Sequence, residues 1–173
     1  MIMKKNKNVA SKNPASHGAG VEFYGSDSDT YDVNESVGYL IKLAHKQLMR
    51  NVDAQLQAYD LTAMQWVPLQ IISTGRGDTV AGCAREAGID NGAMTRMLDR
   101  LEGKGLVRRQ RSNDDRRVVN IALTNAGKKI AREIPPVISN VLNRHLQGFS
   151  QHEFELIKDL LKRFLTNGEL PTE

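Results

Sequence analysis

The sequence contains a single cysteine, Cys83, among its 173 residues. One thiol cannot support an internal disulfide framework, and such scarcity is typical of a reducing compartment. No apolar run approaches the roughly 20 residues that span a bilayer, and the N-terminus lacks the apolar core of a secretion signal. We therefore expect a cytoplasmic protein with one hydrophobic core and no membrane anchor.

Residue patterns for metal binding and catalysis are missing as well. The histidines are scattered, and His145 and His152 alone approach a ligand spacing. The run Gly75-Arg76-Gly77 lacks the second half of either common phosphate-binding motif. No Ser/His/Asp arrangement or carboxylate pair follows from spacing. We expect no metal, no cofactor and no enzymatic activity.

The stretch from Thr79 to Thr124 has the pattern of two short helices followed by a hairpin. Apolar spacing predicts a helix from Thr79 to Ala87, and Gly88 suits the sharp turn after it. Asp90 is placed to cap a second helix. The apolar stripe of that helix is formed by Met94, Met97, Leu98 and Leu101. Two helices joined in this way are typical of a helix-turn-helix.

The residues after Gly105 alternate between apolar and polar. Residues 106–111 and 117–123 predict two strands, and the polar residues 112–116 predict the turn between them. From Lys104 to Arg117 there are six Lys or Arg against two Asp, whereas the whole chain has a net charge of only +4. The pattern predicts a mainly α protein with a small, basic β-hairpin wing, that is, a winged helix-turn-helix.

Three motifs in this stretch resemble those of the multiple-antibiotic-resistance regulator (MarR) family. They are residues 89–101, Gly105-Leu106-Val107, and Asp115-Arg116-Arg117 followed by Leu123-Thr124-Asn125-Ala126-Gly127. The Asp-x-Arg pattern shortly before Leu-Thr makes the resemblance specific, and it covers roughly residues 33–166. The resemblance implies a DNA-binding dimer in which the first helix and the last two interleave across a twofold axis.

The chain divides into four predicted parts. They are a disordered tail (1–32), an N-terminal dimerisation helix (33–60), the winged helix-turn-helix DNA-binding region (61–124) and C-terminal dimerisation helices (125–168). The first helix is too long for one winged domain to cover, so a second copy of the chain is the expected partner. The basic start of the tail is either a solvated leader or an arm that touches DNA phosphates.

Capping residues mark the helix boundaries in these parts. Thr62 and Ser150 each open a capping box, and Thr124 caps the helix after the wing. Pro68 is either late in a first turn, where its missing amide costs little, or at a mild kink, and we favour the first turn. Pro135-Pro136 must kink or restart their helix.

Side chains opposite the apolar stripe of the second helix are the candidate major-groove contacts. They are Asn91, Thr95, Arg96 and Arg100. Arginine suits bidentate contact with guanine, and threonine suits a phosphate or a thymine methyl group. The alternative is structural, with Asp99 pairing with Arg96 or Arg100 along the helix surface.

The wing supplies further candidate DNA contacts. The family resemblance implies that Arg117 enters the minor groove, where negative potential is concentrated, with Asp115 fixing its direction. Arg108, Arg111 and Arg116 are expected to meet phosphates or solvent. Two recognition helices on a twofold axis require a palindromic operator with half-sites about 10 bp apart.

A small-molecule effector is implied by the same resemblance, because many members release DNA when a small aromatic acid or phenol binds beside the dimer helices. The candidate ligand-binding residues are His45, Arg50, Met64, Trp66 and Leu69. The alternative places Trp66 and Met64 in the core and His45 and Arg50 in solvent. Thr95 with Arg109 is a second candidate anion site, and Cys83 is expected to fill core space rather than sense oxidants.

We therefore expect a ligand-responsive, homodimeric transcriptional regulator of double-stranded DNA, most often a repressor in the resembled family. A ligand that prefers another separation of the recognition helices lowers DNA affinity by its differential binding free energy. The alternative is an effector-independent or architectural DNA-binding regulator of the same fold.

Overall fold

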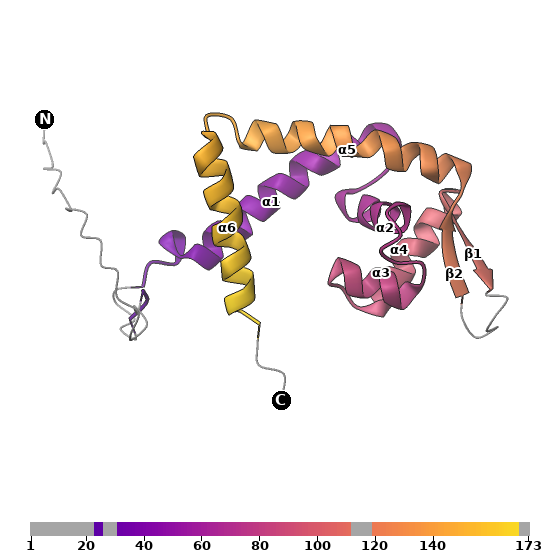
Figure 1. Ribbon diagram of the computed structural model, residues 1–173, viewed down its shortest axis with the longest axis horizontal. Helices are drawn as coiled ribbons and strands as arrows, with labels where there is room; N and C mark the ends of the chain where they lie inside the picture. The colour runs from indigo at the N-terminus through magenta and orange to yellow at the C-terminus, as the bar shows by residue number, and fades with distance from the viewer. Residues whose placement is uncertain (1–22, 26–30, 112–118, 170–173) are drawn as a thin grey trace, which may run out of the picture. The chain divides into compact units, whose positions relative to one another are not determined.

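The computed structural model describes residues 23–25, 31–111 and 119–169. This part of the chain is mainly helical and contains one two-stranded antiparallel sheet (Figure 1). None of its helices is long and apolar enough to cross a membrane. The predicted tail lies largely outside the described residues, as does the tip of the wing, including Asp115, Arg116 and Arg117.

The first helix is shorter than the predicted span of residues 33–60. A separate 3-10 helix, Val33–Glu35, comes first, and helix α1 runs from Val37 to Leu56. Ser36 breaks the run because its backbone is extended and its hydroxyl accepts a hydrogen bond from the amide of Tyr39, at 3.3 Å. A second 3-10 helix, Gln57–Tyr59, follows α1 and ends at Asp60, whose φ of 52° is left-handed.

Helix α2 (Ala63–Ser73) begins at the predicted capping box, in which Thr62 and Gln65 satisfy each other's backbone amides. The expected position of Pro68 was wrong, because it is the sixth residue of the helix and so lies in the second turn. Its side chain is fully buried, and apolar packing offsets the hydrogen bond that proline cannot donate.

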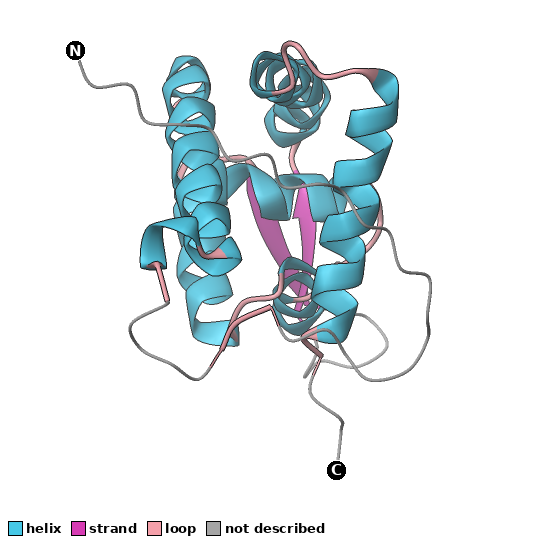
Figure 2. Cartoon of the chain, turned by 90° about the vertical axis from the view of Figure 1, so that its left-hand side faces the viewer, coloured by secondary structure: helices cyan, strands magenta, loops and turns pink. Residues whose placement is uncertain are grey.

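Helices α3 (Val80–Ala87) and α4 (Asn91–Gly103) precede the strands β1 (Val107–Arg111) and β2 (Val119–Leu123). The strands pair from Val107 with Leu123 to Arg111 with Val119, and Figure 2 shows them side by side. The connection between α2 and α3 also pairs with β2, since the amide of Ile121 donates to the carbonyl of Asp78 at 2.6 Å. The wing is thereby attached to the helix-turn-helix along its inner strand.

Helix α5 (Asn125–His145) starts at the predicted cap, Thr124, and helix α6 (Gln151–Asn167) at the predicted capping box of Ser150. Of the two predicted effects of Pro135-Pro136, a restart of the helix was wrong, because α5 is one unbroken element, and a kink stays a prediction. Proline's fixed φ is helical, so the pair removes local hydrogen bonds without ending the helix.

The hydrophobic core lies beneath the helix-turn-helix and joins it to the longer helices. Its fully buried members include Leu56 from α1, Leu69 from α2, Met94, Leu98 and Leu101 from α4, and Ile134 from α5. Burying side chains of this size stabilises the fold by about 1.5–3 kcal/mol each. The buried face of α4 is therefore fixed, and its opposite face is held toward solvent.

Candidate functional site

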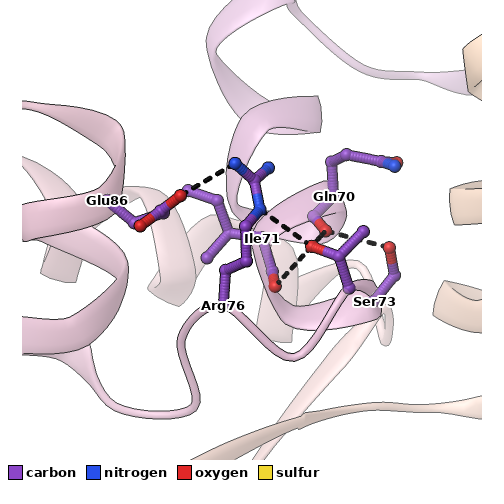
Figure 3. Close-up of polar contacts among 6 residues, drawn as sticks. Gln70, Ile71, Ser73, Arg76 and Glu86 are labelled. Atoms are coloured by element: carbon purple, nitrogen blue, oxygen red, sulfur yellow. Dashed lines mark hydrogen bonds and ion pairs between the residues drawn. The ribbon is translucent and has the colours of Figure 1, made fainter.

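The turn between α3 and α4 has the geometry of a helix-turn-helix. Thr79 caps α3 by accepting a hydrogen bond from the amide of Gly82 at 3.1 Å. Gly88 ends the helix with a φ of 67°, a conformation that favours glycine. Asp90 then caps α4 by accepting a hydrogen bond from the amide of Ala93 at 2.8 Å. An ion pair between Arg76 and Glu86, at 2.8 Å, ties the preceding loop to α3 (Figure 3).

Three of the four predicted major-groove residues are exposed on α4. Asn91, Arg96 and Arg100 are open to solvent, and Thr95 is half-buried. The Thr95 hydroxyl donates to the carbonyl of Asn91 at 2.7 Å, which fixes its rotamer. Arg96 and Arg100 are four residues apart, so they lie on the same side of the helix. This face presents hydrogen-bond donors suited to base edges and phosphates.

Arg109 on β1 joins the wing to α4. Its guanidinium contacts a carboxylate oxygen of Asp99 at 2.6 Å and one of Glu102 at 2.7 Å. The backbone amide of Arg109 also donates to Glu102, at 3.0 Å. Partial burial lowers the pKa of Arg109, but hydrogen bonds and attraction to the two carboxylates outweigh this effect and raise it. Asp99 thus pairs across to the wing, and not with Arg96 or Arg100 along the helix.

The ion pairs of Arg109 occupy the second candidate anion site, which consists of Thr95 and Arg109. The guanidinium of Arg109 is engaged by two carboxylates and the hydroxyl of Thr95 by a carbonyl. An incoming anion would have to displace these partners. The sequence offered no signal for the contact, because Asp99 and Arg109 belong to different elements.

The predicted wing residues divide between the described strands and the tip. Arg108 and Arg111 lie on β1 and are exposed, whereas Asp115, Arg116 and Arg117 fall outside the described residues. Alternation along the strand places Arg108 on the side of the hairpin opposite Arg109. Arg108 accordingly lines a hollow on the α5 side.

The base of the wing is fixed to its neighbours on two sides. Lys104 forms an ion pair with the Asp60 carboxylate at 3.2 Å, donates to the Asp60 carbonyl, and reaches the side-chain oxygen of Gln65 at 3.4 Å. On the other side, the amide of Thr124 donates to the carbonyl of Leu106 at 3.0 Å. A methyl group on Gly127 would lie 1.9 Å from that carbonyl oxygen, so α5 starts in direct contact with the wing.

A mostly apolar pocket of about 300 Å³ lies between α1, α2, the α3–α4 turn and α4. Three of the predicted ligand residues line it, namely His45, Met64 and Trp66. Four methionines line it in all, Met49, Met64, Met94 and Met97. Methionine side chains are flexible and polarisable, and they adapt well to aromatic rings. The helical spacing of Met94 and Met97 indicated a packing role alone, because spacing does not show that residues also border a cavity.

The two other predicted ligand residues do not line this pocket. Leu69 is fully buried in the core. Arg50 lines a separate open groove along α1, together with His45 and the basic residues Lys42 and Lys46. The expected arrangement of a cation facing the Trp66 wall is therefore absent from the described pocket lining, where His45 is the one ionisable residue.

Cys83 is fully buried in α3, and its thiol lies 3.7 Å from the carbonyl oxygen of Gly77. Burial, followed by the charge of Asp78, raises the pKa of this thiol, so the reactive thiolate is disfavoured. Within the described residues no group of His, Cys, Asp or Glu has the arrangement needed to hold a metal ion.

Helices α3 and α4, their turn and the hairpin define the class of this protein as a winged helix-turn-helix. The sequence model of the MarR family matches residues 61–119, which contain these elements up to the start of β2. A mutant MarR from E. coli complexed with operator DNA is similar in structure, with 29% sequence identity, 78% of this chain and 99% of that chain covered, and a TM-score of 0.71.

Two more distant structures share the fold. MepR from S. aureus, solved as a DNA complex, has 23% identity, covers 76% of this chain and 98% of its own, and has a TM-score of 0.72. CouR from Rhodococcus jostii RHA1, bound to p-coumaroyl-CoA, has 19% identity and a TM-score of 0.68. The match covers 79% of this chain and 96% of CouR. Residues 61–119 match the MarR family, and the described chain has the winged-helix fold of MarR-type transcriptional regulators.

Proposed function

We propose that this chain is a homodimeric repressor that binds a palindromic operator and is released from it by a small phenolic ligand. The observation that carries the proposal is the exposed face of α4, where Arg96 and Arg100 stand opposite the buried Met94, Leu98 and Leu101. The E. coli MarR structure with operator DNA supports it, because that protein is similar over most of the chain.

The proposed division of labour follows from side-chain chemistry. Arg96 and Arg100 read guanine edges in the major groove, and Asn91 and Thr95 contact a base or a phosphate. Arg111 and Arg116 meet phosphates, which fix the register of the protein on DNA without reading sequence, whereas Arg108 lines the hollow on the α5 side. By family resemblance Arg117 enters the minor groove, oriented by Asp115.

The dimer is supported by apolar surface on the C-terminal helices. None of the residues of α6 is buried, although one side of this helix is strongly apolar. Its exposed apolar residues are Leu156, Ile157, Leu160, Leu161, Phe164 and Leu165. A contiguous apolar face of this kind indicates a missing partner surface. A twofold pair would bury it and would place two α4 helices on a palindrome.

The effector proposal rests on the methionine-lined pocket. Its volume of about 300 Å³ suits a single aromatic ring with a short substituent, and its lining is almost entirely apolar. His45 offers one polar contact, which a phenolic hydroxyl satisfies more readily than a carboxylate, since no arginine or lysine lines the pocket. CouR, which shares this fold, is bound to p-coumaroyl-CoA, which supports the proposal of a ligand.

The pocket also provides a route from ligand to DNA. Met94 and Met97 belong to α4, whereas His45 and Met49 belong to α1. A ligand that fills the space between them contacts both the recognition helix and an expected dimer helix. If it binds best at a separation that does not match the operator, DNA affinity falls by the difference in binding free energy.

The test is binding of the purified chain to labelled DNA from upstream of its own gene, with and without a panel of phenols and aromatic acids. We expect tight binding that phenols release, with quenching of the single tryptophan, Trp66. His45→Leu should weaken release by about tenfold through the lost hydrogen bond, and Gln47→Leu, on the same helix but outside the pocket, should not.

The DNA part is tested separately by Arg100→Ala. This variant should lose discrimination at one base pair, by about 1–3 kcal/mol, while binding random DNA almost as before. Absence of binding at low salt would contradict the DNA-binding proposal. Tight binding that no phenol changes would instead support an effector-independent regulator of the same fold.

A further inference from the structure

A second hollow, of about 680 Å³, lies between the end of α2, the hairpin and the start of α5. It shares no lining residue with the methionine-lined pocket, and no residue of α4 lines it. Its volume is within the range of roughly 300–1,000 Å³ that small-molecule sites occupy.

Three cationic side chains from two elements converge on this hollow. Arg108 comes from β1, and Lys128 and Arg132 come from α5. Lys128 and Arg132 are four residues apart and so share one side of the helix. None of the three forms an ion pair with another described residue. Asp78 is the one acidic residue in the lining, so positive charge prevails.

Gln70, which also lines the hollow, carries a buried hydrogen-bond acceptor that lacks a donor among the described residues. The side-chain oxygen of Gln70 is buried and accepts no hydrogen bond from the described protein groups. Figure 3 shows the side chain of Gln70 extending away from the Arg76–Glu86 ion pair. Buried acceptors are nearly always satisfied, and rotation of the Gln70 amide would bring this oxygen to the hollow, where a ligand can donate to it.

We propose that this hollow binds a small phosphate monoester that carries a hydroxyl group. The phosphate dianion matches the three cations, and the planar guanidinium of Arg108 or Arg132 suits two phosphate oxygens at once. The hydroxyl group donates to the oxygen of Gln70. A monocarboxylate would leave more of the positive charge uncompensated, and an apolar ligand would leave all of it.

The position of the hollow favours a free small molecule over a phosphate of the DNA backbone. Arg108 lies on the side of the hairpin opposite Arg109, which contacts α4. The hollow is built from α2, the strands and α5, whereas the proposed operator contacts are on α4 and on wing residues from Arg111 onward, none of which lines it. Operator phosphates beside α4 are therefore not expected to reach Lys128 and Arg132.

The test is a ³¹P NMR titration of the full chain with glycerol 2-phosphate and, separately, with inorganic phosphate, at constant ionic strength. We expect saturable binding of both, with glycerol 2-phosphate the tighter ligand. Lys128→Gln or Arg132→Gln should weaken both by about tenfold or more through the loss of a charged hydrogen bond. Lys129→Gln, the matched control outside the hollow, should bind like the parent chain.

Gln70→Leu separates the roles of the two ligand groups. This variant should bind glycerol 2-phosphate only as tightly as inorganic phosphate. Its affinity for inorganic phosphate should equal that of the parent chain. Non-saturable binding, or equal weakening in Lys129→Gln and Lys128→Gln, would overturn the proposal. The proposal would also be overturned if Lys128→Gln bound phosphate like the parent chain but showed a smaller salt slope of DNA binding. Lys128 would then belong to the DNA interface.

Discussion

Arg108 and Arg109 are adjacent in the sequence and serve different surfaces. Arg109 is held between Asp99 and Glu102, with contacts of 2.6 and 2.7 Å, whereas Arg108 lines the hollow beside α5. The alternation of a strand separates the two side chains. One basic run thus supplies both a structural clamp and a charged site, and the local density of positive charge overstates what is available to DNA.

Cys83 illustrates how burial decides the chemistry of a single residue. The raised pKa of its thiol favours the neutral form in the native chain. Because the pKa of this thiol is higher in the folded chain, its contribution to the free energy of unfolding is fully present below the unfolded pKa, near 8.5. That contribution is lost as the pH rises through the folded pKa. We therefore expect iodoacetamide at pH 8 to label native Cys83 at least about 100-fold more slowly than the denatured chain.

The labelling rate is measured by mass spectrometry, with guanidinium-denatured protein as the reference. Slow labelling that tracks unfolding would confirm a packing role for Cys83. Rapid labelling of the native chain would instead show that the thiol is accessible, and a redox role would have to be reconsidered.

At the scale of elements, Arg109 determines how the wing meets the recognition helix. We expect Arg109→Met to weaken operator binding by about tenfold, because the wing loses its anchor and two carboxylates beside the DNA are left unpaired. Adding Asp99→Asn should recover part of the loss by removing one of those charges. Both effects are measured by fluorescence anisotropy with labelled operator DNA.

The salt dependence of that binding distinguishes positioning from direct contact. A positioning residue leaves the slope of log K against log salt unchanged, whereas a phosphate contact lowers it by about one ion. A reduced slope in Arg109→Met would therefore contradict the role assigned to Arg109, whatever the size of the affinity loss.

The boundaries of elements were predictable where they depend on local contacts. Thr62, Asp90, Thr124 and Ser150 each cap a helix as expected, because a cap bonds an amide only three residues away. Pro68 was misplaced because its tolerance depends on burial in the core. The clamp by Arg109 and the pairing of Asp78 with Ile121 were not predictable, since they join elements that are distant in sequence.

The residues of the candidate site were likewise predictable only where local spacing decides their position. The exposed positions of Arg96 and Arg100 followed from helical period alone, as they lie opposite an apolar stripe. The pocket was only half predictable, because His45 and Trp66 line it but Leu69 does not. Which apolar residues border a cavity depends on how four segments pack, and no spacing rule reports that.

At the scale of the whole molecule, α6 tests the proposed dimer. Phe164 is 52% exposed and lies on the apolar side of the helix. We expect Phe164→Asp to produce a monomer at micromolar concentration in analytical ultracentrifugation, because a charge would be buried at the interface. Thr166→Asp places the same charge on the polar side of α6 and should remain dimeric. If both variants were dimeric, or if both were monomeric, the apolar face of α6 would not be the dimer interface.

The lack of any buried residue in α6 has a consequence for the protein inside a cell. A helix with no buried side chain gains little order from its own chain, so in the proposed dimer its stability depends on the concentration of the partner protomer. Dilution then acts on this element as a mild denaturant would. In the proposed dimer, the operator-binding form would therefore rise more steeply than in proportion to the expression level, because pairing depends on protomer concentration.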